Sequence, residues 1–219
     1  MRSRFARSRL RRLPAALAIA SVLALAACNL ERPESFVPTS YDLGPPPAYA
    51  RSNPAIAGTL LVPPVRAPGW LDDTGIVYRL LYEAPAGTRV YAMSRWADEP
   101  AALVTDRVRA RLAAASAGIV EPGFSARSDY SLRVELEDFS QYFKAPSQSE
   151  VRLRARVTLL DTDGRMLLAQ RVFDINRTAE PNAPGAVKAL TEASDAFVEE
   201  LVKWTIENAR GAKKGDEKK

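Results

Sequence analysis

The sequence of 219 residues contains no histidine and a single cysteine, Cys28. Without histidine the chain lacks the commonest general base and the commonest zinc ligand, so hydrolysis by a Ser–His or Cys–His pair is excluded. It also lacks a Gly-x-Ser-x-Gly motif, a glycine-rich phosphate loop and a conspicuous pair of catalytic carboxylates. We therefore predict a protein that is not an enzyme and that binds neither a metal nor a dissociable cofactor. One cysteine cannot form a disulfide within the chain, so packing and hydrogen bonds must hold the fold.

Residues 1–27 have the pattern of a bacterial export signal. Six arginines precede an apolar run of 15 residues from Leu13 to Ala27, interrupted by Pro14 and Ser21. A membrane-spanning helix needs about 20 residues, so a cleaved signal peptide is favoured over a permanent transmembrane anchor. No later stretch of the sequence approaches the apolar length of a membrane span.

The end of this run, Leu25-Ala26-Ala27-Cys28, resembles the bacterial lipobox. The resemblance implies cleavage between Ala27 and Cys28, attachment of diacylglycerol to the Cys28 thiol, and acylation of the new amino group. Two or three acyl chains, at about 0.8 kcal/mol per buried CH₂, anchor a protein durably to a membrane. The alternative is an ordinary secretory signal in which Cys28 is incidental.

The formal net charge of +5 does not describe the processed chain. Removing the six arginines of the signal from 31 basic residues leaves 25, against 26 acidic residues, which is a net charge of −1. A nucleic-acid partner is therefore not expected. The 192 residues that follow Ala27 suffice for one domain with its own core, or for two small ones at most.

We predict that residues 28–39 are the lipidated cysteine and its tether. The sequence from Asn29 to Ala57 holds six prolines and little apolar periodicity, which is typical of an extended, semi-rigid segment. Tyr41-Asp42-Leu43 fits a short edge strand, in which case the free tether is only about 11 residues, or some 35 Å. The folded domain then covers residues 40–210, and residues 211–219 form a disordered charged tail.

The first half of the domain predicts three strands and a helix. The strands are expected at Gly58–Val62, Ile76–Tyr82 and Arg89–Met93, the last two as a hairpin. The helix begins at Asp98-Glu99-Pro100, and Gly118 is expected to close it. Its apolar residues recur at spacings of three and four up to Ala115, and three arginines lie off that stripe: Arg107, Arg109 and Arg111.

The second half begins with two alternating strands. Apolar even-numbered residues alternate with charged ones over 130–136, and apolar odd-numbered residues alternate with arginines over 151–159, after a polar loop at Lys144–Glu150. Antiparallel pairing with both apolar sets inward puts Glu135 and Glu137 beside these arginines. A solvated, neutralised face is favoured over a site for anionic headgroups.

A third strand, Met166–Ile175, and a long helix from Ala186 to about Ala209 complete the domain. The turn Asp161-Thr162-Asp163-Gly164 fits a hairpin better than a calcium loop, because the other calcium ligands are missing. The apolar seam of the helix, which ends at Trp204, predicts a helix lying on a sheet, with a coiled-coil seam as the alternative. The predicted fold is α+β: one mixed, mostly antiparallel sheet with two main helices packed on it.

The three tryptophans receive different predictions. Trp204 lies on the apolar seam of the last helix and is expected in the core. Trp70 and Trp96 fall in predicted loops, where a large aromatic side chain is a candidate contact for a partner protein.

The order and spacing of several short motifs resemble those of the ABC-type transport auxiliary lipoproteins, of the paraquat-inducible lipoprotein C type. The motifs are the lipobox, Tyr41-x-Leu43, Val62-Pro63-Pro64-Val65, Ile76-x-Tyr78-Arg79, Arg95-Trp96-Ala97-Asp98-x-Pro100, Tyr130-x-Leu132-x-Val134-x-Leu136-x-x-Phe139, Leu159-x-Asp161 with Gly164-Arg165, and Ala186-Val187-x-Ala189-Leu190 in the helix that ends with Trp204. The likeness covers essentially all of the chain after Cys28.

This resemblance implies an outer-membrane lipoprotein that faces the periplasm. Its implied partners are a mammalian-cell-entry (MCE) family protein and an ABC permease and ATPase, which together move lipids or hydrophobic compounds between two membranes. Asn29 is not the Asp associated with inner-membrane retention, which favours outer-membrane sorting. A homo-oligomer is a further expectation. An envelope structural or regulatory lipoprotein, for example an activator of cell-wall synthesis, is the alternative.

Overall fold

The computed structural model describes residues 37–49, 55–123, 126–161 and 166–216, with residues 210–216 described by their backbone alone. The fold lies in the compact unit Pro38–Lys219. Its strands are β1 (Thr39–Tyr41), β2 (Ile56–Leu61), β3 (Gly75–Leu80), β4 (Arg89–Trp96), β5 (Ser116–Val120), β6 (Tyr130–Ala145), β7 (Gln148–Leu160) and β8 (Leu167–Ala179). Its helices are the one-turn 3₁₀ helix η1 (Gly69–Leu71), α2 (Pro100–Ala115) and α3 (Ala183–Asp216).

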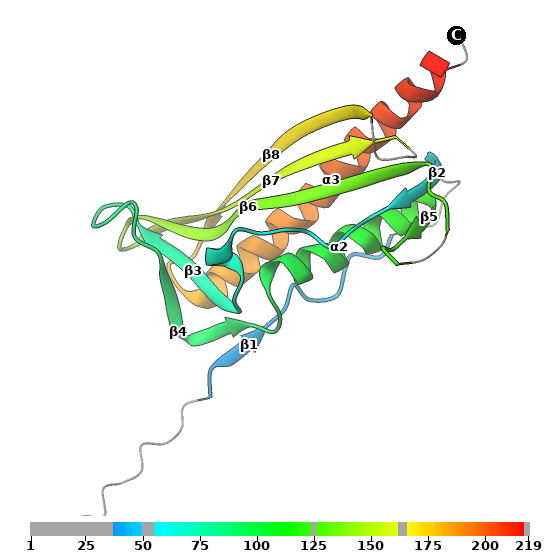
Figure 1. The fold of residues 1–219 in the computed structure, drawn as a ribbon. Helices are drawn as coiled ribbons and strands as arrows, with labels where there is room; N and C mark the ends of the chain where they lie inside the picture. The colour runs from blue at the N-terminus through cyan, green and yellow to red at the C-terminus, as the bar shows by residue number, and fades with distance from the viewer. Residues whose placement is uncertain (1–36, 50–54, 124–125, 162–165, 217–219) are drawn as a thin grey trace, which may run out of the picture. The chain divides into compact units, whose positions relative to one another are not determined.

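The eight-stranded sheet is organised around the long strand β6, which pairs directly with β2, β3 and β7 (Figure 1). On one side it pairs antiparallel with β7, which in turn pairs antiparallel with β8. On its other side it pairs parallel with β2 near Tyr130 and with β3 near Phe143. Strand β5 extends the β2 end, and β4 followed by β1 extends the β3 end. The sheet is mixed and carries two long helices, which confirms the predicted fold class.

A β-bulge at Glu137 interrupts the ladder between β6 and β7. Before the bulge the even-numbered residues of β6 face the core, as predicted and as with Leu132. After it the odd-numbered residues face the core, as with Phe139, which lies opposite the buried Leu153. The extra residue therefore places two consecutive carboxylates, those of Glu137 and Asp138, on the other face of the sheet.

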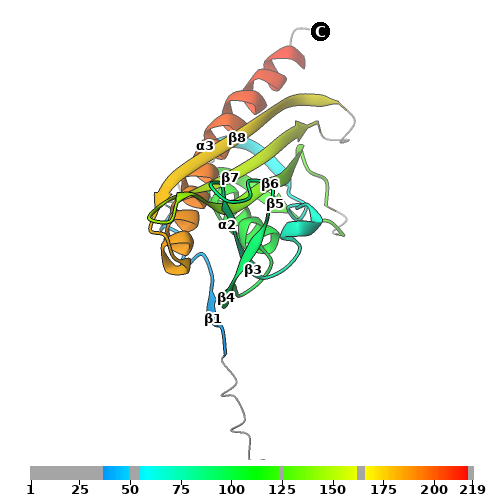
Figure 2. The ribbon, with the colours of Figure 1, turned by 90° about the vertical axis from the view of Figure 1, so that its left-hand side faces the viewer.

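Both long helices lie on the same side of the sheet (Figure 2). Helix α3 packs on β7 and β8, and α2 packs beside α3 and next to β5. The predicted seam of α3 faces the core, with Val187 partly buried at its start; its buried members are Leu190, Ser194, Phe197, Leu201 and Trp204. This burial confirms the prediction of a helix lying on a sheet.

Aromatic contacts join α3 to β8. The Phe173 ring lies edge-on to Phe197 and Trp204, with ring centres 5.5 and 6.0 Å apart. Trp204 is a core residue, as predicted. Near the end of the helix the Tyr130 hydroxyl donates a hydrogen bond to the carbonyl of Ala209 at 3.1 Å.

Helix α2 ends three residues before Gly118, which was wrongly predicted to close it. At Ser116 the backbone becomes extended, and the Ser116 hydroxyl donates to the carbonyl of Leu112 at 2.8 Å. The chain then continues directly as β5, which pairs with β2 and includes Gly118. The sequence of β5 has too little alternation to predict a strand.

Helix α3 is longer at both ends than the predicted span of 186–209. The Asn182 side chain accepts a hydrogen bond from the N–H of Gly185 at 2.7 Å, so Asn182 starts the helix and Pro184 lies in its first turn. Residues 211–216, predicted as part of a disordered tail, continue the helix. Residues 217–219 lie outside the described residues.

Two connections also differ from the sequence prediction. The polar loop expected at Lys144–Glu150 is a tight turn, because β6 continues to Ala145 and β7 begins at Gln148. Across this turn the Lys144 ammonium pairs with the Glu150 carboxylate at 2.6 Å. The predicted hairpin turn after Asp161 falls on residues 162–165, outside the described residues. The predicted edge strand near Tyr41 is present as β1 and ends at Tyr41 rather than Leu43.

Candidate docking surfaces

Trp70 is an accessible aromatic side chain on η1. Its neighbour Leu71 is buried and holds η1 against the domain, whereas Trp70 remains 36% exposed. The guanidinium carbon of Arg79 lies 5.0 Å from the centre of a Trp70 ring, and Arg79 also donates to the carbonyl of Ala86 at 3.3 Å. A cation over an exposed aromatic ring contributes about 0.5–1 kcal/mol. The cation thus helps to fix the orientation of Trp70.

An exposed aliphatic residue, Val90, lies on the same face of the β3–β4 hairpin as Arg79. Val90 is 58% exposed and pairs with Val77, two residues before Arg79 on β3. We call Trp70, Arg79 and Val90 the Trp70 corner. Aromatic residues and arginine are the residue types that most often contribute binding energy at protein interfaces.

Trp96 is not on a loop, contrary to the sequence prediction. It is the last residue of β4 and only 1% exposed, with its ring centre 5.5 Å from that of Phe139. The backbone N–H of Trp96 donates to the carbonyl of Thr74, and Trp96 is the register partner of Tyr41 in β1. Pairing with both neighbouring segments therefore extends β4 past Met93, the predicted end of the strand. The side chain is not accessible to a partner in this structure.

The face of β6–β8 opposite the helices carries a chain of ion pairs. Arg154 lies between two acids, 2.8 Å from Glu137 and 3.1 Å from Asp174. Arg152 pairs with Asp174 at 2.5 Å, and Arg156 pairs with Glu137 at 2.6 Å. Hydrogen bonds from the guanidinium groups hold the pKa of Glu137 and of Asp174 below the ordinary values. The predicted neutralised face is present, with Asp174 as an acid that the sequence analysis missed.

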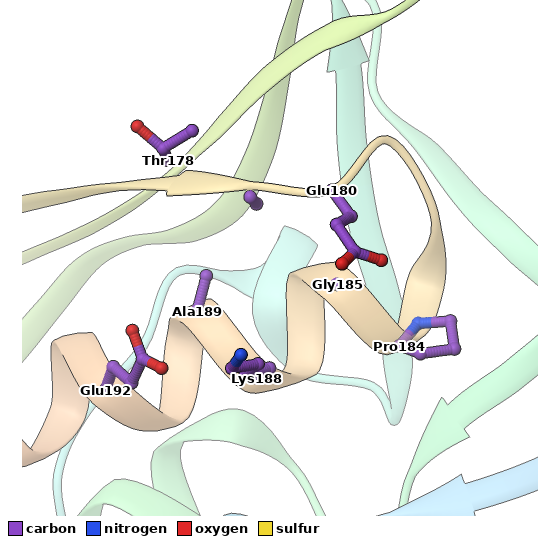
Figure 3. Close-up of a pocket in the computed structure, with 8 residues that line it drawn as sticks. Thr178, Glu180, Pro184, Gly185, Lys188, Ala189 and Glu192 are labelled. Carbon is purple, nitrogen blue, oxygen red and sulfur yellow. The ribbon is translucent and has the colours of Figure 1, made fainter.

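A hollow of about 260 Å³ lies where β8 leads into α3. Figure 3 shows Glu180 at the end of the strand and Lys188 and Glu192 on α3 around it. Side chains of both signs line this hollow, so it is not specialised for ions of one charge. The described part of the chain has no group of three or more His, Cys, Asp or Glu residues suited to a metal ion.

Residues 42–49, here called the strap, cross the domain between α2 and α3. Leu43 of the strap is buried in the core. Arg107 of α2, whose side chain is 3% exposed, donates from Nη2 to the carbonyls of Leu43 and Gly44, the latter at 3.1 Å. Gly44 has a positive φ of 65°, and its N–H donates to the Asp42 carboxylate at 2.7 Å.

The same arginine also connects the strap to α3. Nη1 of Arg107 lies 3.4 Å from Oδ1 of Asp195. Burial raises the pKa of the Asp195 carboxyl, and the Arg107 charge opposes this shift. Arg107 was predicted to lie off the buried stripe of α2, and this prediction is wrong because the strap and α3 cover it.

Tyr49 lies farther along the strap, over Arg111 of α2. The guanidinium carbon of Arg111 is 5.0 Å from the centre of the Tyr49 ring. Arg111 also makes two hydrogen bonds to the Glu199 carboxylate of α3, at 2.6 and 3.0 Å. These bonds lower the pKa of Glu199, whereas burial raises the pKa of Tyr49. The strap is therefore held by two arginines of one helix, each paired with an acid of the other.

Among the described residues no helix combines the length and the apolar character needed to cross a membrane.

Comparison with known structures shows a shared fold. A protein from Xanthomonas campestris has a crystal structure that matches with a TM-score of 0.65 at 22% identity, covering 82% of this chain and 98% of that one. The crystal structure of an uncharacterized protein matches with a TM-score of 0.59 at 18% identity, covering 76% of this chain and 97% of that one.

No curated protein matches the sequence significantly. The family model described as ABC-type transport auxiliary lipoprotein component matches residues 41–202, which is more than half of the chain. The matched region begins at Tyr41, the last residue of β1, and ends at Val202, a buried residue of α3. The match therefore includes all strands from β2 to β8, the whole of α2 and the first part of α3, and this protein belongs to the family of ABC-type transport auxiliary lipoprotein components.

Proposed function

We propose that this protein is a non-enzymatic adaptor, anchored in the outer membrane through lipidated Cys28 and facing the periplasm. Its partners in this proposal are an MCE-family protein and an ABC permease and ATPase that move lipids or hydrophobic compounds across the envelope. The observation that carries the proposal is the family match over residues 41–202, which follows a lipobox and a tether in the sequence. The residue after Cys28, Asn29, supports outer-membrane sorting.

The domain supports a binding role through its accessible surfaces. The Trp70 corner combines a partly exposed indole, an arginine and an exposed valine. A tryptophan already oriented in the free protein loses less conformational entropy on binding than a mobile side chain does. We therefore assign the contact with the MCE partner to the Trp70 corner.

Replacing Trp70 with alanine should reduce copurification of the MCE partner at least tenfold, because a central aromatic contact often contributes 2 kcal/mol or more. The measurement is affinity capture from detergent-solubilised membranes, with the bound proteins identified by mass spectrometry. Tyr82→Ala is the matched control, since Tyr82 is also a half-exposed aromatic residue and is not part of the Trp70 corner. Undiminished capture by a folded Trp70→Ala variant would remove the corner from the interface. Capture of cell-wall enzymes in place of transport proteins would favour the regulatory alternative.

Replacing Cys28 with alanine should move the protein from the membrane fraction to the soluble periplasmic fraction, or leave an uncleaved precursor. The thiol is the attachment point for the diacylglycerol that we propose, and no other cysteine can replace it. Mass spectrometry of the unaltered protein should show an amino-terminal peptide that begins at Cys28 and carries acyl chains. An unmodified Cys28, or normal membrane retention of a cleaved Cys28→Ala protein, contradicts the anchor.

A further inference from the structure

Few contacts hold residues 39–49 to the domain. Strand β1 pairs with β4 over three residues, Thr39 to Tyr41. Of residues 42–49 only Leu43 is buried. Beyond it, the strap is attached mainly through the Arg107 hydrogen bonds to backbone carbonyls and the contact between Tyr49 and Arg111.

Hollows lie on both sides of the strap. One, of about 700 Å³, separates Ser40–Gly44 from Lys188 and Glu192 of α3. The other, of about 310 Å³, lies between Asp42–Pro46 and the α2 residues Leu103 and Asp106. The strap thus leaves open space at both of its edges, although Leu43 and Arg107 are buried where it crosses the helices. Segments with few buried apolar contacts open more readily than the core does.

The Tyr49 hydroxyl is buried beneath the strap without a hydrogen-bond partner among the described residues. Nearby, Nη1 of Arg107 and Oδ1 of Asp195 make no hydrogen bond and face each other as an ion pair at 3.4 Å. An unpaired buried hydroxyl destabilises the closed arrangement, because in an open one it regains hydrogen bonds to water. The Tyr49 hydroxyl belongs to the strap itself, so opening this segment hydrates it.

We propose that residues 39–49, here called the latch, open as a unit while β6, β7 and α3 stay folded. Opening removes Leu43 from the core and exposes Arg107 and Arg111 in the groove between α2 and α3. It also frees residues 39–49, which adds about 11 residues, or roughly 34 Å at about 3.1 Å each, to the tether. This inference rests on the proposed lipid anchor at Cys28. The closed and open latch then allow two different maximum distances between the membrane and the folded domain.

The test is hydrogen exchange of the full lipidated chain in detergent micelles, without any partner protein. The result is therefore independent of the transport assignment. Residues 45–47 are prolines without an N–H, so the informative amides are those of β1 and the Gly44 amide, which donates to the Asp42 carboxylate. After correction for intrinsic exchange rates, these amides should exchange at least 100-fold faster than the paired amides of β6 and β7, and with a weaker dependence on urea. Equal protection and an equal urea dependence for the two sets of amides overturn the latch.

A disulfide across β1 and β4 tests whether the segment moves as a unit. Ser40 and Arg95 are register partners, so a Ser40→Cys/Arg95→Cys variant has the backbone spacing for a disulfide. Oxidation should slow exchange of the Gly44 amide at least tenfold, and a reducing agent should reverse the effect. The matched control is Thr158→Cys/Gln170→Cys across β7 and β8, which should leave the latch rate unchanged. A disulfide that forms between β1 and β4 without slowing the strap overturns the proposal.

Discussion

Replacing Arg107 with leucine should lower the free energy of unfolding by about 2–3 kcal/mol, less than the cost of removing one partner from a fully buried ion pair, because the Asp195 side chain is 31% exposed. The Arg107 side chain is 3% exposed and lies 3.4 Å from the Asp195 carboxylate. Without Arg107 this carboxylate stays partly buried with no cation beside it, and the carbonyls of Leu43 and Gly44 lose their donor. Urea unfolding followed by far-UV circular dichroism measures the change.

Two further variants separate the buried pair from general damage to α2. Arg109→Leu removes a more exposed arginine of the same helix, which bonds to the carbonyl of Val62 and to Glu121. We expect that variant to cost at most about 1.5 kcal/mol. The double variant Arg107→Leu/Asp195→Leu should recover most of the loss, because neither charge then remains in the interior. A loss below about 1 kcal/mol for Arg107→Leu would show that the strap does not depend on this side chain.

Replacing Trp96 with alanine should lower the free energy of unfolding by about 3–5 kcal/mol, as large-to-small changes in packed cores do. The side chain is 1% exposed and packs against Phe139, so alanine leaves a cavity at the end of β4. Trp70→Ala is the contrasting variant, because its side chain is 36% exposed, and it should change stability by about 1 kcal/mol or less. The same urea experiment measures both.

A phenylalanine variant refines this test. Nε1 of Trp96 is buried without an acceptor among the described residues, so Trp96→Phe removes an unsatisfied donor and part of the ring together. We expect it to cost less than half as much as alanine. Similar losses for both variants would mean that the indole donates to a group not seen in the structure, and a small loss for alanine would mean that Trp96 is not a packing residue.

Most of the fold follows from periodicity in the sequence. The alternation over 130–136 and 151–159 predicts two strands, their antiparallel pairing and the correct facing residues. The seam that ends at Trp204 predicts the face that α3 buries. These elements are long, and each repeats one pattern many times. Strand β5 was not predicted because it has only five residues and is a strand through its pairing with β2, which is remote in the sequence.

The candidate surfaces were harder to predict because they depend on segments that meet only in the fold. Trp70 was found as a large aromatic residue in a proline-containing loop, but its companion Arg79 is supplied by the next strand. Arg107 lies beside the apolar stripe of α2, where arginines are usually solvated. Arg107 is buried because the strap covers it on one side and α3 on the other. The sequence of α2 alone gives no information about either neighbour.

The bulge at Glu137 also makes this part of the chain intolerant of a change in length. Deleting one residue there would turn every later side chain of β6 over, so that Phe139 and Phe143 would leave their buried positions and the polar side chains of Ser140 and Tyr142 would replace them. The downstream half of β6 carries β3, and through it β4 and β1, so the error would spread to the site of attachment of the latch. Sequences that share this fold should therefore accept insertions and deletions in the surface turns well before they accept one at this position.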